Sequence, residues 1–227
     1  ESDEIETVTK LIHQEEGSLD LLVNNAGIIG WGAVMDREMD YFKSVFDVNL
    51  WGVLSMVKAC YPLLKKSSNN PVICNISSQG ANYSLPFWSP YMMSKRALEA
   101  FSSCLRLELM SEGIRVVSIA PGAFKSEMLP NAAPTLERYT RRYKSDDHAK
   151  AVKLFGAAAG NPERKEKSPV IVGKLIDKIM RGTSRKARYQ PGKRFIPDHL
   201  LEKFPTWFVD MVIGKMMKSF PLDGENY

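Results

Sequence analysis

The hydrophobic positions of the chain follow two patterns, which are short continuous apolar runs and longer segments with apolar residues every three or four positions. The short runs are residues 21–23, 71–76 and 114–119. Each is bounded by polar or turn residues, which is typical of a strand buried on both faces of a parallel sheet. We therefore predict strands at these three places and a further short strand at 187–189.

The longer segments predict helices over residues 1–16, 36–46, 49–66, 91–111 and 170–180. In the first of them Ile5, Val8, Leu11 and Ile12 share one helical face. Gly113 follows the fourth helix at a position that favours a helix stop. Because segments of helix length separate the strands, we expect an α/β fold with a Rossmann-like, doubly wound parallel sheet.

The pattern loosens after Gly122, where residues 123–169 contain several prolines and glycines and a charge-rich stretch. A last apolar segment covers residues 200–217, and Pro205 is expected to divide it into two helices. With 227 residues, 44% of them hydrophobic, the chain is long enough for one sizeable core. We treat residues 1–227 as a single domain, with a core over 1–126 and a substrate loop and helical part over 127–227.

Composition excludes several classes of function. The net charge of +5 comes from basic residues scattered along the chain without a recognition motif, so no nucleic-acid partner is expected. No apolar run reaches the roughly 18 residues of a membrane span. Cys60, Cys74 and Cys104 lack metal-ligand spacing and lie in apolar stretches, so we predict three buried thiols, no metal site and an intracellular, reducing location.

Small and polar residues follow each of the three main strands. They are Asn24-Asn25-Ala26-Gly27, then Ser77-Ser78-Gln79-Gly80, then Pro121-Gly122. In open parallel sheets ligands bind beyond the carboxyl ends of the strands, so these loops should converge on one site. Each segment alone is also compatible with an ordinary turn at the end of a strand.

Tyr91 and Lys95 lie four residues apart, which places the phenol and the ammonium one turn apart on the same helical face. A fixed positive charge nearby lowers the pKa of a phenol toward neutral pH, where a general acid or base works best. Taken alone, such a pair is equally compatible with packing on an amphipathic helix surface.

Together these motifs resemble the short-chain dehydrogenase/reductase family. The matching residues, in order, are Asn24-Asn25-Ala26-Gly27, Asn49, Asn75-Ile76-Ser77-Ser78, Tyr91, Lys95 and Pro121-Gly122. The spacing of 13 residues between Ser78 and Tyr91 agrees with the family pattern and selects Ser78 over Ser77. Other residues, including Arg188-Tyr189, are similar to the branch of retinol, hydroxysteroid and hydroxybutyrate dehydrogenases.

The resemblance implies a catalytic set of Asn49, Ser78, Tyr91 and Lys95. Tyr91 would exchange the proton with the substrate oxygen, and Ser78 would polarise that oxygen. Lys95 would hold the nicotinamide ribose and lower the Tyr91 pKa, while Asn49 would anchor a water. The cofactor would be NAD or NADP, bound by Asn24, Ala26, Gly27, Asn49, Tyr91, Lys95, Pro121, Gly122 and Ser126.

The resemblance also indicates where a substrate would bind. The residues expected to line the substrate site are Ser78, Gln79, Trp88, Tyr91 and Phe124. Large apolar side chains around them favour a lipid-like alcohol or ketone, although any one of them is equally compatible with a core position. The segment 200–217 would either lie on the surface of a membrane, such as that of an organelle, or pack on the core of a cytoplasmic protein. Helices 49–66 and 91–111 commonly pair in the family, so we expect a homo-oligomer.

One departure from the family pattern bears on function. The family begins with a strand and a glycine-rich turn that binds pyrophosphate, and this sequence contains neither. We therefore expect a sheet that lacks roughly its first three strands. The alternative function is a non-catalytic binding or scaffold protein that keeps the fold without holding a dinucleotide.

Overall fold

A computed structural model describes residues 2–82, 84–122, 124–126, 128, 167–192, 205, 207, 208 and 211. Within these residues the strands are β1 (Leu21–Asn24), β2 (Val72–Ile76), β3 (Arg115–Ile119) and β4 (Arg188–Tyr189). The helices are α1 (Ser2–Glu15), α2 (Met39–Phe46), α3 (Gly52–Lys66), α4 (Ser89–Glu108) and α7 (Val170–Met180). All four strands were predicted within two residues of their observed bounds.

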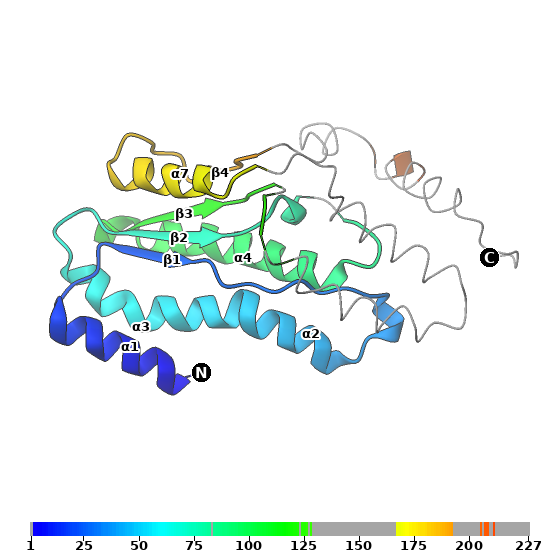
Figure 1. Cartoon of the computed structure of the whole chain (residues 1–227), viewed down its shortest axis with the longest axis horizontal. Coiled ribbons are helices and arrows are strands. Elements are labelled where there is room, and N and C mark those ends of the chain that lie inside the picture. Colours follow the sequence, from blue (N-terminus) through cyan, green and yellow to red (C-terminus); the bar gives the residue numbers. More distant parts are fainter. Residues whose placement is uncertain are drawn as a thin grey trace, which may run out of the picture.

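The strands form one parallel sheet in the order β1-β2-β3-β4 (Figure 1). Leu22 pairs with Ile73, and Ile73 pairs with Val116, so the three long strands run in register. The predicted α/β class with a parallel sheet is confirmed. Among the described residues β1 pairs with β2 alone, and Val23 at this edge is 37% exposed.

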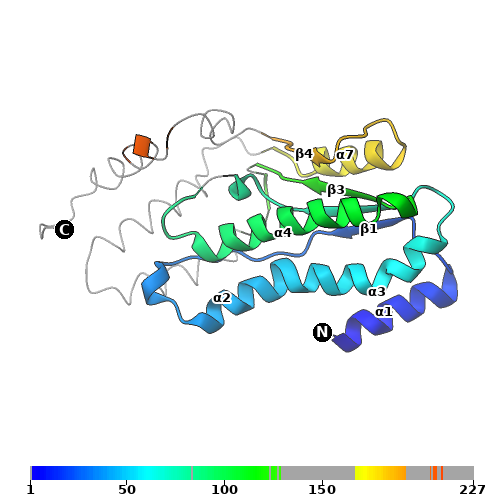
Figure 2. The ribbon, with the colours of Figure 1, turned by 180° about the vertical axis from the view of Figure 1, so that it is seen from behind.

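Helices cover both faces of this sheet, which explains why the strands are apolar throughout. Leu22, Ile73 and Val116 pack against α3 and α4, and Figure 2 shows α4 in front of the sheet. Val72, Cys74 and Val117 face the other way, toward α7 and its buried Ile179. Alternate residues of each strand therefore enter two separate hydrophobic clusters.

The two helices predicted at 36–46 and 49–66 are in fact one continuous helical run. A π-helical turn, Asp47–Trp51, joins α2 to α3. No proline or left-handed glycine interrupts the backbone there, and Asp47 keeps right-handed helical angles. A π-helical turn rotates the side chains that follow it, and such turns are frequent at functional sites. Here Asn49 lies within the turn and is fully buried.

Gly113 ends the segment that follows α4, as predicted. Its φ is +73°, in the left-handed region, and the chain enters β3 two residues later. The prediction of three buried thiols was wrong for Cys104, which is exposed, whereas Cys60 and Cys74 are buried. Cys104 lies on the solvent side of α4, whose buried face is formed by residues such as Leu98, Ser102 and Leu105.

Two predicted regions lie largely outside the described residues. These are the proline- and glycine-rich part of 123–169 and the apolar segment 200–217. None of the helices in the described part of the chain has the length and apolar character needed to cross a membrane.

Replacement by alanine should change the free energy of unfolding in opposite directions at two glycines. Gly113→Ala should lower the free energy of unfolding by about 1 kcal/mol, because alanine is strained at positive φ. Gly173→Ala should raise it by about 0.5–1 kcal/mol, because Gly173 lies inside α7 with nothing within 4 Å of an added Cβ. Urea unfolding measures both values. Equal effects at the two sites would contradict the backbone conformations given for Gly113 and Gly173.

Candidate active site

The carboxyl ends of the strands meet at one edge, as the sequence predicted. The Ser77 amide donates to the Ile119 carbonyl oxygen at 2.7 Å, and the Gln79 amide donates to Pro121 O at 3.0 Å. The Gly122 amide in turn donates to Pro191 O at 3.0 Å, after β4. The loops that follow β2, β3 and β4 are therefore bonded to one another in sequence.

Ser78 and Tyr91 face each other across the loop after β2. The Ser78 hydroxyl accepts the Gly80 amide at 3.0 Å, and its interaction with the phenol acts to lower the pKa of Tyr91. A Cβ atom placed on Gly80 would lie 3.3 Å from Ser78 Oγ and 3.5 Å from Tyr91 Cε1. Glycine therefore allows the loop backbone to approach the Ser78 hydroxyl and the Tyr91 ring closely.

Lys95 lies one helical turn after Tyr91 and reaches the end of β2. It is only 2% exposed, and its ammonium donates to the Ile76 carbonyl oxygen at 2.9 Å. A Cβ atom on Gly27 would lie 3.3 Å from both Lys95 Nζ and Asn49 Oδ1. The loop after β1 thus lies directly against Lys95 and Asn49, so the three predicted positions Gly27, Asn49 and Lys95 come together.

The Asn49 side chain ties the loop after β1 to α4. Its Oδ1 accepts the Ile28 amide at 2.8 Å, and its Nδ2 donates to Ile28 O and to Ser94 Oγ, each at 2.9 Å. The Ser94 hydroxyl donates to the Tyr91 carbonyl oxygen at 2.7 Å. Three separate segments are therefore joined by one amide group.

Burial shifts the pKa values of both residues of the central pair. It lowers the pKa of Lys95 to about 8, against the opposing charge of Glu99. It raises the pKa of the Tyr91 phenol, and the hydrogen bond from Ser78 only partly offsets this. The expected lowering of the Tyr91 pKa by Lys95 is not found here, because desolvation dominates and the Lys95 ammonium is bonded to Ile76 O.

The remaining residues predicted to bind cofactor lie at the same edge with different exposure. The Asn24 side chain is buried and donates to Asn75 Oδ1 at 2.8 Å, so it faces the core. Ala26 and Ser126 are exposed, and Pro121 and Gly122 are half-buried. Of this set, Gly27 lies directly against Lys95.

The predicted substrate residues are more deeply placed than expected. Gln79 is 2% exposed, and Trp88 is 8% exposed with its ring centroid 3.9 Å from that of Trp31 and 5.9 Å from that of Tyr91. Phe124 is half-buried beside Gly192, in the loop after β4. Trp31 and Trp88 pack on one another and form an aromatic wall next to Tyr91.

Sequence reasoning missed several residues that support the site. Ser94 was passed over as a spacer between Tyr91 and Lys95, although its place one turn after Tyr91 was a usable signal. Asn75, a polar residue within a buried strand, was quoted only for the motif, yet it donates to Ser102 Oγ at 2.9 Å. Ser102 gave no signal in the sequence.

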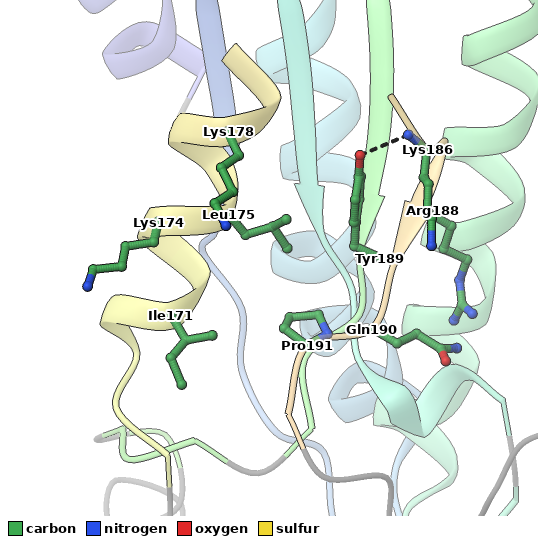
Figure 3. A pocket seen from close by; sticks show the side chains of 9 residues that line it. All are labelled: Ile171, Lys174, Leu175, Lys178, Lys186, Arg188, Tyr189, Gln190 and Pro191. Carbon is green, nitrogen blue, oxygen red and sulfur yellow. Dashed lines mark hydrogen bonds between the residues drawn. The ribbon is translucent and has the colours of Figure 1, made fainter. Parts of the chain in front are cut away.

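The structure also contains a hollow of about 730 Å³ away from Tyr91, between α7 and β4 (Figure 3). Its lining residues are Ile171, Lys174, Leu175, Lys178, Lys186, Arg188, Tyr189, Gln190 and Pro191. None of the predicted catalytic residues lines it, so it is distinct from the site at the strand ends.

Ser94 is expected to contribute more to the stability of the fold than an exposed serine of the same helix. Ser94→Ala should lower the free energy of unfolding by about 1–3 kcal/mol, because one buried Asn49 hydrogen would lose its acceptor. Ser103→Ala, at an exposed position of α4, controls for helix propensity and should be neutral or slightly stabilising. Equal free energies of unfolding for the two variants, measured with urea, would contradict a stabilising bond between Asn49 and Ser94.

The buried lysine should make stability depend on alkaline pH. The folded chain releases the Lys95 proton near pH 8 and the unfolded chain near 10.5, so the unfolded state binds more protons between these values. The penalty for burying Lys95 is therefore present in full below pH 8 and is relieved as the pH rises to 10.5. Relative to Lys95→Met, the wild type should gain about 3 kcal/mol between about pH 7 and pH 11. A pH-independent difference in urea unfolding would show that the amine is not desolvated.

Comparison with known proteins agrees with this geometry. The family model described as short chain dehydrogenase matches residues 1–137. The chain is 40% identical to mitochondrial D-beta-hydroxybutyrate dehydrogenase of Rattus norvegicus over 120 residues, which are 53% of this chain and 34% of that protein. It is 31% identical to 3beta-hydroxysteroid dehydrogenase dhs-16 of Caenorhabditis elegans over an alignment of 236 residues, covering 94% of this chain and 57% of that protein.

The fold has counterparts among solved structures as well. A short-chain dehydrogenase from Streptomyces avermitilis superposes with a TM-score of 0.70 and 22% identity, covering 96% of this chain and 74% of the other. The chain thus spans only part of the length of these relatives. Because the family match extends over more than half of the chain and includes the loops after β1, β2 and β3, the chain belongs to the short-chain dehydrogenase/reductase family.

Proposed function

We propose that this protein is an NAD(P)-dependent oxidoreductase that interconverts an alcohol and its carbonyl compound. The observation that carries the proposal is the placement of the Ser78 hydroxyl and the Tyr91 ring against the same glycine, Gly80, with the buried amine of Lys95 one helical turn after Tyr91. A hydroxyl donor beside a phenol is the arrangement needed to bind one oxygen atom and move one proton. Family membership supports the same reaction class.

The residues around Lys95 fit a nicotinamide nucleotide. Only glycine at position 27 leaves the space above Lys95 Nζ and Asn49 Oδ1 clear, since a Cβ would lie 3.3 Å from each. The Lys95 ammonium retains two hydrogens beyond the one given to Ile76 O, and these can bind the hydroxyl groups of a ribose. We infer that Gly27, Lys95 and Tyr91 hold the nicotinamide side of the cofactor, with Pro121 and Gly122 at the neighbouring loop.

Each residue has a defined task in the proposed reaction. Bound nicotinamide would supply or accept the hydride. In reduction Tyr91 gives its phenolic proton to the substrate oxygen, and in oxidation it takes that proton back. Ser78 donates a hydrogen bond to the same oxygen and stabilises the negative charge that develops on it. The buried Lys95 amine, anchored at Ile76 O, would bind the ribose of the nucleotide one helical turn from Tyr91.

An apolar substrate is the best match to the surroundings of Tyr91. Trp31 and Trp88 form the wall beside the phenol, and Phe87 is also buried there. Phe87 has a φ of +69°, a strained value for a bulky residue, and strain of this kind gathers at ligand sites. Relatives named for hydroxybutyrate and hydroxysteroid substrates support an alcohol or ketone of lipid-like character.

A non-catalytic binding or scaffold role is the competing proposal. The aligned segments cover 34% and 57% of the lengths of the two relatives above. Titration of NADH and NADPH separates the two roles, because Trp31 and Trp88 lie near Tyr91 and should report binding by their fluorescence. Saturable binding of either nucleotide supports the enzyme, and binding of neither supports the scaffold.

Loss of one phenolic oxygen should separate binding from chemistry. Tyr91→Phe keeps the ring against Trp88 but removes the proton donor, so turnover should fall about a hundredfold to ten-thousandfold. Its Kd for the nucleotide should stay within about twofold of wild type, since the aromatic ring remains in place. Tyr61→Phe removes a phenol that is bonded to exposed Glu112 and should leave turnover unchanged. Near-normal turnover in Tyr91→Phe would exclude Tyr91 as the acid.

A further inference from the structure

Arg188 connects three elements around the candidate active site. It lies in β4, and its Nε donates to Glu99 Oε2 of α4 at 3.0 Å. Its Nη2 donates to Asn82 Oδ1 at 2.8 Å, four residues after Ser78. Figure 3 shows the Arg188 side chain directed toward α4, away from Tyr189 of the same strand. One guanidinium thus holds a carboxylate and the loop that carries Ser78 in fixed positions.

Glu99 lies one helical turn after Lys95, as Lys95 lies one turn after Tyr91. Its side chain is 17% exposed, whereas surface ion pairs of this protein, such as Lys43 with Asp40, have side chains that are 66% and 89% exposed. Its Oε1 is buried without a hydrogen-bond partner among the described residues. A carboxylate in this environment is weakly screened by water, so its field acts on nearby charges.

Few other charges face the Lys95 amine. The titratable groups of α4 that lie one turn before and one turn after Lys95 are Tyr91 and Glu99. Arg188 of β4 is also near, through its ion pair with Glu99. The loop after β1 and the π-helical turn contribute Gly27 and Asn49, which do not titrate. From the end of β2 the contact is the Ile76 carbonyl. Glu99 is therefore the one negative charge that acts on Lys95 within the described residues.

We propose that Glu99 and Arg188 are positioning residues of the active site: Glu99 keeps the buried Lys95 amine protonated, and Arg188 holds Glu99 and the Ser78 loop in register with it. The pair acts through Lys95 and Ser78 and does not itself touch substrate. The proposal rests on the function proposed above, because it assigns the pair a task in the same site. It also explains why a two-residue strand at the sheet edge contributes a side chain that reaches α4.

The direction of the effect follows from burial. Desolvation has already lowered the pKa of Lys95 to about 8, close to neutral pH, and Glu99 opposes this. Without the Glu99 charge the amine should lose its proton at lower pH. Activity that needs a charged Lys95 would then decline at a lower pH than in the wild type, while a purely structural role of Glu99 would leave this pH dependence in place.

The experiment measures the Lys95 pKa directly, by the NMR chemical shift of its ε-carbon against pH, with the signal assigned from its absence in Lys95→Met. In Glu99→Gln the pKa should fall by about half a unit to one unit. Asp177→Asn is the matched control, because Asp177 also pairs with an arginine Nε, at 2.8 Å, but on the exposed surface of α7. It should leave the Lys95 pKa unchanged.

Two further arms complete the test. Glu99→Asp keeps the negative charge, so the pKa of Lys95 should stay close to its wild-type value. If this pKa falls as far as in Glu99→Gln, the charge is not the cause. An unchanged pKa in Glu99→Gln would overturn the proposal. Where turnover is measured, its alkaline limb should move to lower pH in Glu99→Gln by the same amount. The NMR result stands without turnover, so failure of the proposed function, seen as binding of neither nucleotide, is distinguishable from failure of this inference.

Discussion

The side-chain amide of Asn49 is the contact on which the arrangement of the site depends. The loop after β1 has no regular secondary structure, so its backbone groups need partners from elsewhere, and Asn49 satisfies both the N–H and the C=O of Ile28. Its remaining hydrogen goes to Ser94, which lies between Tyr91 and Lys95. The π-helical turn Asp47–Trp51 gives Asn49 its direction. Loop, turn and α4 therefore hold one another in place around Tyr91 and Lys95.

Burial gives this arrangement its chemical character. Tyr91 and Lys95 are both removed from water, which makes the phenol a weaker acid and the ammonium a stronger one than in solution. Charges that appear during proton transfer are then stabilised by fixed groups, among them Ser78 and Lys95, instead of by reorganising water. Burying a lysine costs free energy, and ionisable groups whose pKa values are shifted by burial are typical of functional sites.

Most of the fold and the central residues could be predicted from the sequence. Continuous apolar runs identified the strands because both faces of the sheet are covered, and the resemblance to the family, with its spacing from Ser78 to Tyr91, supplied the proposed catalytic set. The join between α2 and α3 was not predicted, since periodicity does not distinguish a π-helical turn from a break. The contacts of Arg188 and Ser102 were also beyond reach, because each depends on a side chain that meets a distant segment only in the folded chain.

The central claim is that Tyr91, Ser78 and Lys95 support hydride transfer to an apolar carbonyl compound. The most direct measurement uses NADH and NADPH deuterated at the reactive carbon of the nicotinamide, with a lipid-like ketone as substrate and mass spectrometry of the product. We predict that the product is an alcohol that carries one deuterium on its carbinol carbon. Alcohol product without deuterium, or no alcohol from a panel of such ketones with either nucleotide, would contradict it.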